Sequence, residues 1–336
     1  MHRRSRTSSP WTATVIAAAL ACPAAAAETA GTPRVVAGPT EIRIVDGERL
    51  ILCYLIEPVR TPPGIDPACG RSGILHPVCS PRGTPVTGAV PRDHPHQSGI
   101  FTAWTNASYE DRRVDFWNLA KRQGRVLHAT LRGTFATGNG AGFEVDLLHR
   151  IEGPAPVDVL RETWRVTARP TDGSHHCFDL ETVQRAIAPA PVSLAKYHYG
   201  GLGVRGPESW LLPTDADLGA APGLAPAGAE IVNSDGQDRL AGNLAHARWV
   251  AMASRPPAAA ACIAALVHPS SFRAPQAARL HPTKPYFSLA PCADGPFVID
   301  AASPFAARYR FLVTDGPADP AWIEAAWQSW VDAAAP

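Results

Sequence analysis

Three β-rich runs in the middle of the chain decide its fold: Phe143-Glu144-Val145-Asp146-Leu147-Leu148, Val159-Leu160-Arg161-Glu162-Thr163-Trp164-Arg165-Val166-Thr167 and His176-Cys177-Phe178-Asp179-Leu180-Glu181-Thr182-Val183. Each run is bounded by turn-forming residues, of which Asp172-Gly173 is the clearest example. Apolar, β-favouring runs of this length with such turns between them predict consecutive antiparallel strands.

Further strands are expected on both sides of this centre. Residues 41–45 and 49–55 flank Asp46-Gly47, which is a strong β-hairpin signal. Residues 127–131 and 133–135 form a β-rich pair of runs, and later strands are expected at 247–253, 261–268, 297–300 and 307–314. Residues 57–91 are crowded with proline and glycine and lack periodicity, so we expect a long irregular excursion there.

One helix is expected, at the C-terminal end of this series. Asp319 can cap it, Pro320 suits its first position, and residues 321–332 carry tryptophans at helical spacing. A tryptophan stripe of this kind is typical of a helix that packs on a sheet. The pattern as a whole predicts a mainly β protein of consecutive antiparallel strands closed by a C-terminal helix, with a single domain over residues 28–336.

The amino-acid composition indicates which classes of protein are not expected. The chain has 336 residues, is 46% hydrophobic and carries a formal net charge of +1, with its basic residues scattered rather than clustered. Nothing in this pattern predicts binding to nucleic acid or to an anionic membrane surface. After the N-terminal region, no segment has the roughly 18 consecutive apolar residues of a spanning helix, so we expect no membrane span.

The N-terminal residues have the pattern of a secretory signal. Three arginines precede an apolar run over residues 11–22, and small residues follow up to Ala27. We therefore expect a signal peptide over residues 1–27 and a periplasmic or secreted protein; lipoprotein processing at Cys22 is the alternative. The cysteines after the signal are then expected to form disulfides, with Cys69 and Cys79 as the first candidate pair. The remaining ones are Cys53, Cys177, Cys262 and Cys292.

The first candidate site begins with Asp93-His94-Pro95-His96-Gln97-Ser98-Gly99 and extends to Trp104, Asp115 and Trp117. Pro95 disfavours a helical His94, so the segment is expected to be extended, which would place both histidines on one face. They would then hold a divalent metal ion or a polar substrate between them. The alternative is that one imidazole caps a turn and the other lies on the surface.

A second candidate segment is Lys196-Tyr197-His198-Tyr199-Gly200-Gly201-Leu202-Gly203-Val204-Arg205. Its glycines do not form a phosphate-binding loop, because the Gly-Lys-Ser/Thr ending is missing. Lys196, His198 and Arg205 are expected to face a ligand. His268, in Val267-His268-Pro269-Ser270-Ser271-Phe272, is expected to line a cleft at a strand end.

These segments, together with Arg308-Tyr309-Arg310-Phe311, resemble blocks of the bacterial PmoA-like family, which is labelled methane oxygenase. The resemblance implies a secreted protein with the β-supersandwich fold of galactose-mutarotase-like, carbohydrate-active enzymes. True methane monooxygenase activity is not expected, because no spanning helix is present. The family usually has a third histidine where this chain has Gln97.

Three functions are consistent with these residues. The first is a carbohydrate-active enzyme, an epimerase, lyase or hydrolase, in which His96 and His198 exchange protons with a sugar and Asp93 or Asp115 orients an imidazole. Trp104 or Trp117 would stack on the sugar ring, while Gln97, Lys196 and Arg205 would bond its hydroxyls. The second is a non-catalytic carbohydrate-binding protein. The third is a metal-dependent enzyme with His94 and His96 as ligands; no other cofactor is expected.

Overall fold

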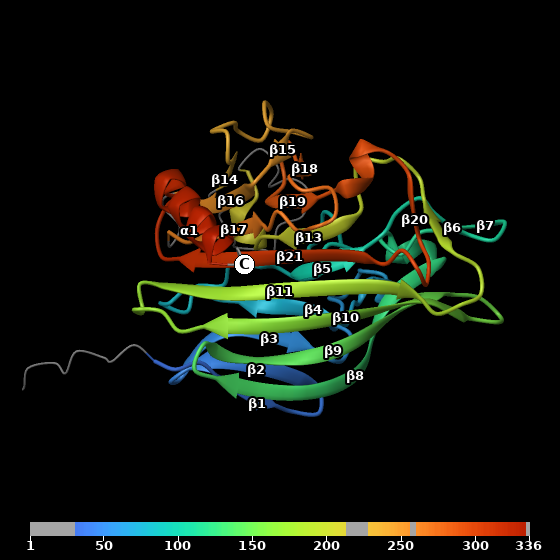
Figure 1. The fold of residues 1–336 in the computed structure, drawn as a ribbon, viewed down its shortest axis with the longest axis horizontal. Coiled ribbons are helices and arrows are strands. Elements are labelled where there is room, and N and C mark those ends of the chain that lie inside the picture. Colours follow the sequence, from blue (N-terminus) through green and yellow to red (C-terminus); the bar gives the residue numbers. More distant parts are fainter. Residues whose placement is uncertain (1–30, 213–227, 256–259, 334–336) are drawn as a thin grey trace, which may run out of the picture.

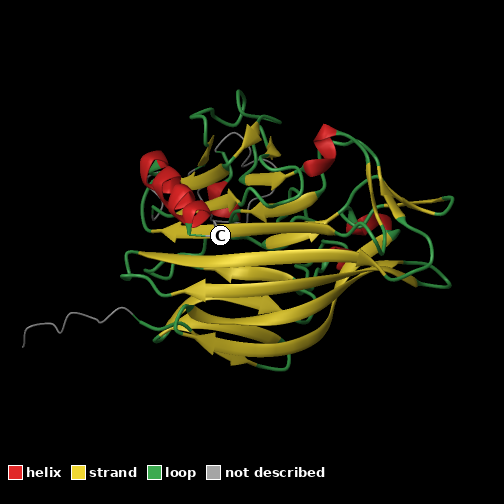
Figure 2. Ribbon diagram, viewed as in Figure 1, coloured by secondary structure: helices red, strands yellow, loops and turns green. Residues whose placement is uncertain are grey.

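Two large antiparallel β-sheets lie face to face, and a small third sheet stands at one end of them (Figure 1). The structure is a computed structural model that describes residues 31–212, 228–255 and 260–333. Strands make up most of its regular structure, and its one α-helix lies against one of the large sheets (Figure 2). The predicted mainly β sandwich with a C-terminal helix is therefore confirmed.

The nine-stranded sheet has the order β1 (Arg34–Ala37), β2 (Glu41–Asp46), β3 (Arg49–Leu55), β4 (Ile74–Val78), β5 (Ile100–Ala103), β13 (Gly201–Arg205), β19 (Tyr286–Leu289), β18 (Gln276–Leu280) and β15 (His246–Ala247). The eight-stranded sheet has the order β14 (Ala229–Asn233), β16 (Trp249–Ser254), β17 (Cys262–Val267), β21 (Phe305–Thr314), β11 (His175–Ala186), β10 (Val157–Arg169), β9 (Gly140–Ile151) and β8 (Gly124–Thr137).

The four-stranded sheet has the order β20 (Phe297–Ile299), β12 (Val192–Leu194), β6 (Ala107–Tyr109) and β7 (Arg112–Val114). Short 3₁₀ helices occur in the loops: η1 (Pro67–Cys69), η2 (Leu119–Lys121), η3 (Glu208–Trp210) and η5 (Pro291–Asp294). The helix α1 (Pro320–Asp332) covers the outer face of the eight-stranded sheet, where its Ile323 and Trp330 pack on side chains of β16 and β17. Within the described ranges, no helix combines the length and apolar character that a membrane span requires.

The segments with clear local sequence signals form the elements that were expected from them. The β2–β3 hairpin turns at Gly47, whose φ of 59° suits glycine. The Asp319 carboxylate accepts a hydrogen bond from the Trp322 amide at 3.1 Å and caps α1. Along β9, Phe143, Val145 and Leu147 are fully buried while their neighbours face outward, so the alternation of the sequence places one face of the strand in the core.

Two strands differ from expectation. The expected runs at 127–131 and 133–135 form one strand, β8, because bulges at His128/Thr130 and Leu131/Gly133 absorb the break in alternation. The excursion over residues 57–91 contains β4, which pairs with β3 and β5. Pro77 inside this strand removes a backbone donor and interrupts the pattern by which a strand is recognised.

The expected disulfides are absent from the part of the chain that the structure describes. All of its cysteines are free and buried, including Cys69 and Cys79. Cys177 and Cys262 belong to the apolar layer under α1, where they act as small apolar side chains. The expected signal peptide, with Cys22, lies outside the described residues.

A buried carboxylate joins the two large sheets. Glu162 of β10 is fully buried and accepts hydrogen bonds from the hydroxyls of Thr102 on β5 and Thr182 on β11, both at 2.6 Å. Trp164 Nε1 donates to it at 2.6 Å, and His149 Nε2 lies 2.8 Å from it. Burial raises the pKa of Glu162, but His149 and the hydroxyl donors outweigh it and hold the pKa below its usual value. The carboxylate is thus compensated by donors from both sheets.

Candidate active site

The candidate site lies on the outer face of the nine-stranded sheet, the face that does not touch the other large sheet. Thr102 of β5 points inward to Glu162, so its neighbour Phe101 points outward. Phe101 pairs with Gly203 of β13, and Arg205, two residues further, lies on the same face. The outer face therefore carries Phe101, Gly203 and Arg205, and loops that fold over it supply the other groups of the site.

Arg205 is the centre of a buried polar cluster. Its side chain is 0% exposed, and its Nη2 and Nη1 atoms donate to the two carboxylate oxygens of Asp93 at 2.6 and 2.9 Å. Nη1 also donates to Gln97 Oε1 at 3.0 Å. The structure thus brings together three predicted site residues, Asp93, Gln97 and Arg205. The cluster anchors the loop of residues 93–97 to β13.

Asp93 also orients an imidazole, that of His94 rather than His96. Burial raises the pKa of Asp93, but hydrogen bonds from His94 and Arg205 outweigh it and hold the pKa far below its usual value. The ionised carboxylate can only accept, so His94 Nδ1, 2.9 Å from Oδ2, carries the proton and donates it. The Nε2 atom of His94 is then a free base on a side chain that is 33% exposed.

Residues 93–97 form a turn, not the extended segment that was expected. The Gln97 amide donates to the carbonyl of His94 at 2.9 Å. The turn nevertheless brings the rings of His94 and His96 to 5.8 Å between centroids. His96 is a partly buried side chain whose pKa falls to about 3 because of its burial, of the charge that His94 carries when it is protonated, and of the charge of Arg71. It is therefore neutral at neutral pH.

A third histidine, which sequence analysis left aside, completes the cluster. His281 follows β18, and its ring centroid is 5.4 Å from that of His94. Its Nδ1 accepts from the backbone amides of Lys284 and Thr283 at 3.1 and 3.3 Å, so its proton sits on Nε2. Burial, followed by the positive groups around it, lowers the pKa of His281 to about 3. His281 is therefore a neutral hydrogen-bond donor at neutral pH.

Aromatic rings form the neighbouring part of the same face. Trp117 is 2% exposed, and its ring centroid lies 4.8 Å from Phe101, 5.9 Å from Tyr199 and 6.4 Å from Tyr286. Tyr199 is only partly buried, so it forms the edge of this cluster that faces solvent. Phe101, Trp117, Tyr199 and Tyr286 are called the aromatic cluster below. It contains one of the two tryptophans expected to contact a sugar.

The other tryptophan, Trp104, is a core residue, and the expectation that it stacks on a sugar is wrong for this structure. It is 0% exposed, its indole N–H donates to Gln184 Oε1 at 2.6 Å, and the rings of Phe305 and Phe297 pack on it. His268 is likewise remote from the cluster of histidines. Its ring packs at 4.9 Å on Trp330 of α1, on the outer face of the opposite sheet.

The second candidate segment contributes Arg205 and Tyr199 to the site, but His198 does not reach the histidine cluster. The ring neighbours of His198 are Tyr197 at 4.2 Å and Tyr199 at 4.7 Å, at the edge of the aromatic cluster. Burial and the charge of Arg279 lower the pKa of His198. Within the described residues, no hydrogen bond or ring contact joins it to His96. Lys196 is exposed in the same segment.

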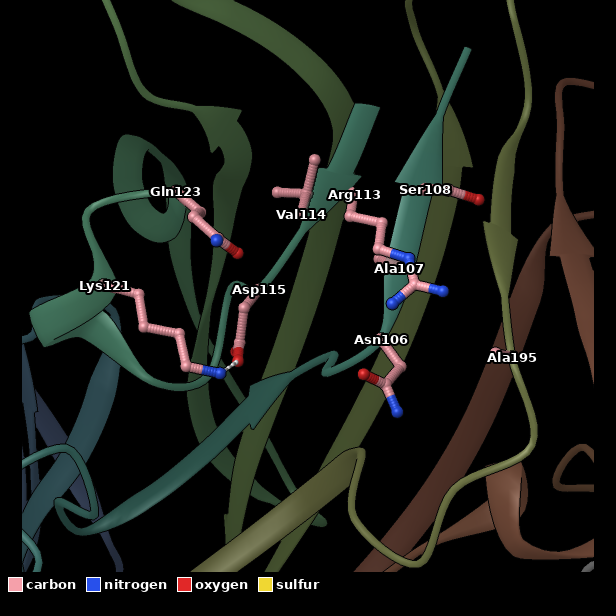
Figure 3. A pocket seen from close by; sticks show the side chains of 9 residues that line it. All are labelled: Asn106, Ala107, Ser108, Arg113, Val114, Asp115, Lys121, Gln123 and Ala195. Carbon is pink, nitrogen blue, oxygen red and sulfur yellow. Dashed lines mark hydrogen bonds and ion pairs between the residues drawn. The ribbon is translucent and has the colours of Figure 1, made fainter. Parts of the chain in front are cut away.

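Asp115 shapes the loop that carries Trp117. Its carboxylate accepts from the amides of Trp117 and Asn118 at 2.9 and 2.8 Å and pairs with Lys121 Nζ at 2.8 Å. Burial raises the pKa of Asp115, but these donors, Lys121 first, lower it overall. The ion pair lines a cavity of about 420 Å³, and Arg113 of β7 is another of its lining residues (Figure 3). No imidazole is oriented by Asp115 in the described structure.

A divalent metal ion fits these side chains poorly. The described residues contain no group of three His, Cys, Asp or Glu side chains that could hold one. His94 Nδ1 is engaged by Asp93, and the protonated Nε2 of His281 is a donor, so only His94 Nε2 and the imidazole of His96 offer lone pairs. Catalytic metal sites commonly use three protein ligands.

The fold and the site together define a β-sandwich protein with a histidine and arginine cluster on one outer face. Residues 41–328 match the model of a protein family described as a family of unknown function, DUF6807, and the chain belongs to that family. None of the curated proteins compared with the chain matches it.

Proposed function

We propose that the protein is a carbohydrate-active enzyme that acts on a sugar or glycoside by histidine acid/base chemistry. The observation that carries the proposal is the oriented pair of Asp93 and His94, with two neutral imidazoles beside it. A base held by a carboxylate next to a neutral hydrogen-bond donor is the arrangement that proton transfer at a bound substrate requires.

The roles follow from the protonation of each group. His94 Nε2 is the base, because Asp93 accepts its Nδ1 proton and stabilises the imidazolium that forms when Nε2 takes a proton. His281 Nε2–H donates to a substrate oxygen without changing its charge, because its pKa of about 3 keeps the ring neutral. His96, also neutral, supplies a second uncharged imidazole. The base role expected for His96 and His198 thus passes to His94.

Aromatic rings and a hydrogen-bonding shell support a sugar as the ligand. Tyr199 is partly exposed beside Trp117, and flat apolar rings are suited to the faces of sugars. The resemblance to PmoA-like and galactose-mutarotase-like proteins favours the same class of substrate, though fold likeness alone does not define chemistry. The N-terminal pattern supports the further proposal that the protein is periplasmic or secreted.

Turnover of sugars by matched variants tests this proposal. Mono- and oligosaccharides would be screened for epimerisation by NMR, for elimination by ultraviolet absorbance and for hydrolysis by released reducing ends. His94→Gln should lower turnover by about 10² to 10⁴-fold. His246→Gln is the control, because His246 is a 53% exposed surface residue. If His94→Gln leaves turnover unchanged, the acid/base proposal is wrong, and binding without turnover identifies a carbohydrate-binding protein instead.

A further inference from the structure

Arg71 is a buried cation for which the described residues supply no ion-paired carboxylate. It precedes β4 and is 2% exposed, and within the described ranges its guanidinium makes one hydrogen bond, from Nη2 to the Trp117 carbonyl at 3.1 Å. Its buried Nε and Nη1 atoms have no hydrogen-bond partner in that part of the chain. The guanidinium carbon lies 4.5 Å from the centroid of Phe101, at one end of the aromatic cluster. Although burial lowers the pKa of Arg71 to about 10, the group is charged at neutral pH.

Arg279 holds the corresponding position at the other end of the aromatic cluster. It projects from β18, and its guanidinium carbon lies 5.1 Å from the centroid of Tyr199. Nη1 donates to Asn243 Oδ1 at 2.8 Å and to the Leu280 carbonyl at 2.6 Å, while Nε is buried without a partner. Among the described residues, no carboxylate lies within ion-pair distance of Arg279 or of Arg71.

Tyr286 lies between the two arginines. Its ring centroid is 6.3 Å from that of Tyr199, over which Arg279 lies, and 6.4 Å from that of Trp117, whose carbonyl accepts from Arg71. The side chain is 0% exposed, and Ser288 is a hydrogen-bonding neighbour of its hydroxyl. Among the described residues, Arg71 and Arg279 therefore have unused donors at the two ends of the aromatic cluster, where an anion would receive them.

Two other cations of this face are paired with carboxylates, Arg205 with Asp93 and Lys121 with Asp115. Arg71 and Arg279 differ from them in having no described carboxylate within ion-pair distance. Arg279 and Tyr199 are partly exposed, so the Arg279 end of the aromatic cluster meets solvent, whereas Arg71 is buried at the other end.

We infer that the substrate is a sugar acid whose carboxylate binds beside Tyr286, between Arg71 and Arg279. The inference deepens the proposed function and rests on it. A carboxylate accepts several hydrogen bonds and binds guanidinium groups through two parallel contacts, whereas a sugar hydroxyl would leave both charges uncompensated. The anchored carboxylate would place the sugar ring on the face that also carries His94, because Phe101, over which Arg71 lies, shares that face with Arg205, and Arg205 holds the Asp93 that orients His94.

Matched pairs of sugars test the inference by thermal shift and titration calorimetry on the full chain. The pairs are glucuronate with glucose, galacturonate with galactose and mannuronate with mannose, together with short oligomers of each, at constant ionic strength. At least one acidic member should stabilise the wild type while its neutral partner does not. Arg279→Gln should weaken its binding by about tenfold or more, since hydrogen bonds to charged groups are strong.

Two further variants make the result decisive. Arg132→Gln, on β8 of the opposite sheet where the side chain is 49% exposed, should leave affinity unchanged. Arg71→Lys tests the buried end of the proposed site. If this variant does not fold, Arg279→Gln alone provides the test. Equal binding of acidic and neutral sugars, binding of neither, or unchanged affinity in Arg279→Gln overturns the inference. The proposed function fails by a different outcome, in which an acidic sugar binds but no histidine variant changes its turnover.

Discussion

Asp93 and Arg205 are 112 positions apart in sequence, yet they form a doubly hydrogen-bonded ion pair whose side chains are 2% and 0% exposed. The pair fixes the turn that carries His94 against a strand of the nine-stranded sheet. Its carboxylate serves both partners, because one oxygen accepts from Arg205 and from His94. Stability and the orientation of the proposed base therefore depend on the same group.

Replacing one member of this pair should be strongly destabilising. Asp93→Asn leaves the Arg205 charge buried and without its anion, which costs about 3 to 5 kcal/mol of unfolding free energy in comparable pairs. Urea denaturation of Asp93→Asn, Arg205→Met and the double variant measures the coupling. The double variant should be more stable than the sum of the single changes implies. Additive losses would show that the two side chains do not depend on each other.

Acid should destabilise the protein through its neutral histidines. His96 and His281 have folded pKa values of about 3 and ordinary values of 6.5, so the unfolded chain binds more protons between these limits. Stability is then present above pH 6.5 and declines as the pH falls towards 3. Urea midpoints between pH 6.5 and about pH 5 measure how the unfolding free energy changes with pH while Asp93, with its ordinary pKa of 3.8, is still ionised in the unfolded chain. His281→Asn should reduce this dependence of stability on pH, whereas His246→Asn should not.

A side chain at Gly203 should disturb the aromatic cluster. A Cβ atom there would lie 2.7 Å from two ring carbons of Phe101 and 3.0 Å from the Tyr286 hydroxyl. Gly203→Ala should therefore lower the free energy of unfolding by about 1 to 3 kcal/mol and weaken binding of the proposed sugar acid. Gly133→Ala on β8 is the matched control, because its Cβ would meet nothing within 4 Å. Similar unfolding midpoints for both variants would contradict the close packing at Gly203.

The described cysteines should behave as buried thiols. Burial raises the pKa values of Cys177 and Cys262 to about 12, so little thiolate exists at neutral pH. Alkylation without reductant should be slow in the folded protein and should reach all six described cysteines once the protein is denatured. Intact mass spectrometry counts the modified thiols. Protection of Cys69 and Cys79 in the denatured, unreduced protein would restore the disulfide that the sequence suggested.

Sequence analysis predicted the elements that local signals define. The Asp46-Gly47 turn and the Asp319 cap were recognisable because the chemistry that forms them lies within a few residues. Strand β4 was missed because Pro77 obscures its periodicity. The turn over residues 93–97 was taken as extended, since Pro95 restricts His94 but does not determine the backbone that follows.

Which residues form the site depends on contacts between residues that are far apart in the sequence, and no local sequence pattern indicates such contacts. The residues next to His281 and Arg71 in the sequence gave no indication of a site. Both side chains lie in the site because distant strands pair and loops pack there. Trp104 and Trp117 are alike in sequence context, but one faces the core and the other the outer face.

The side chains of strand β5 contact a different environment on each face of the nine-stranded sheet. On its inner side, Thr102 holds the Glu162 carboxylate, and on its outer side Phe101 supports the Arg71 guanidinium. A buried anion and a buried cation are thus separated by the thickness of a single strand. A change in the core at Thr102 would shift Phe101 and the buried end of the proposed ligand site, so this interior residue would affect the proposed recognition as well as folding.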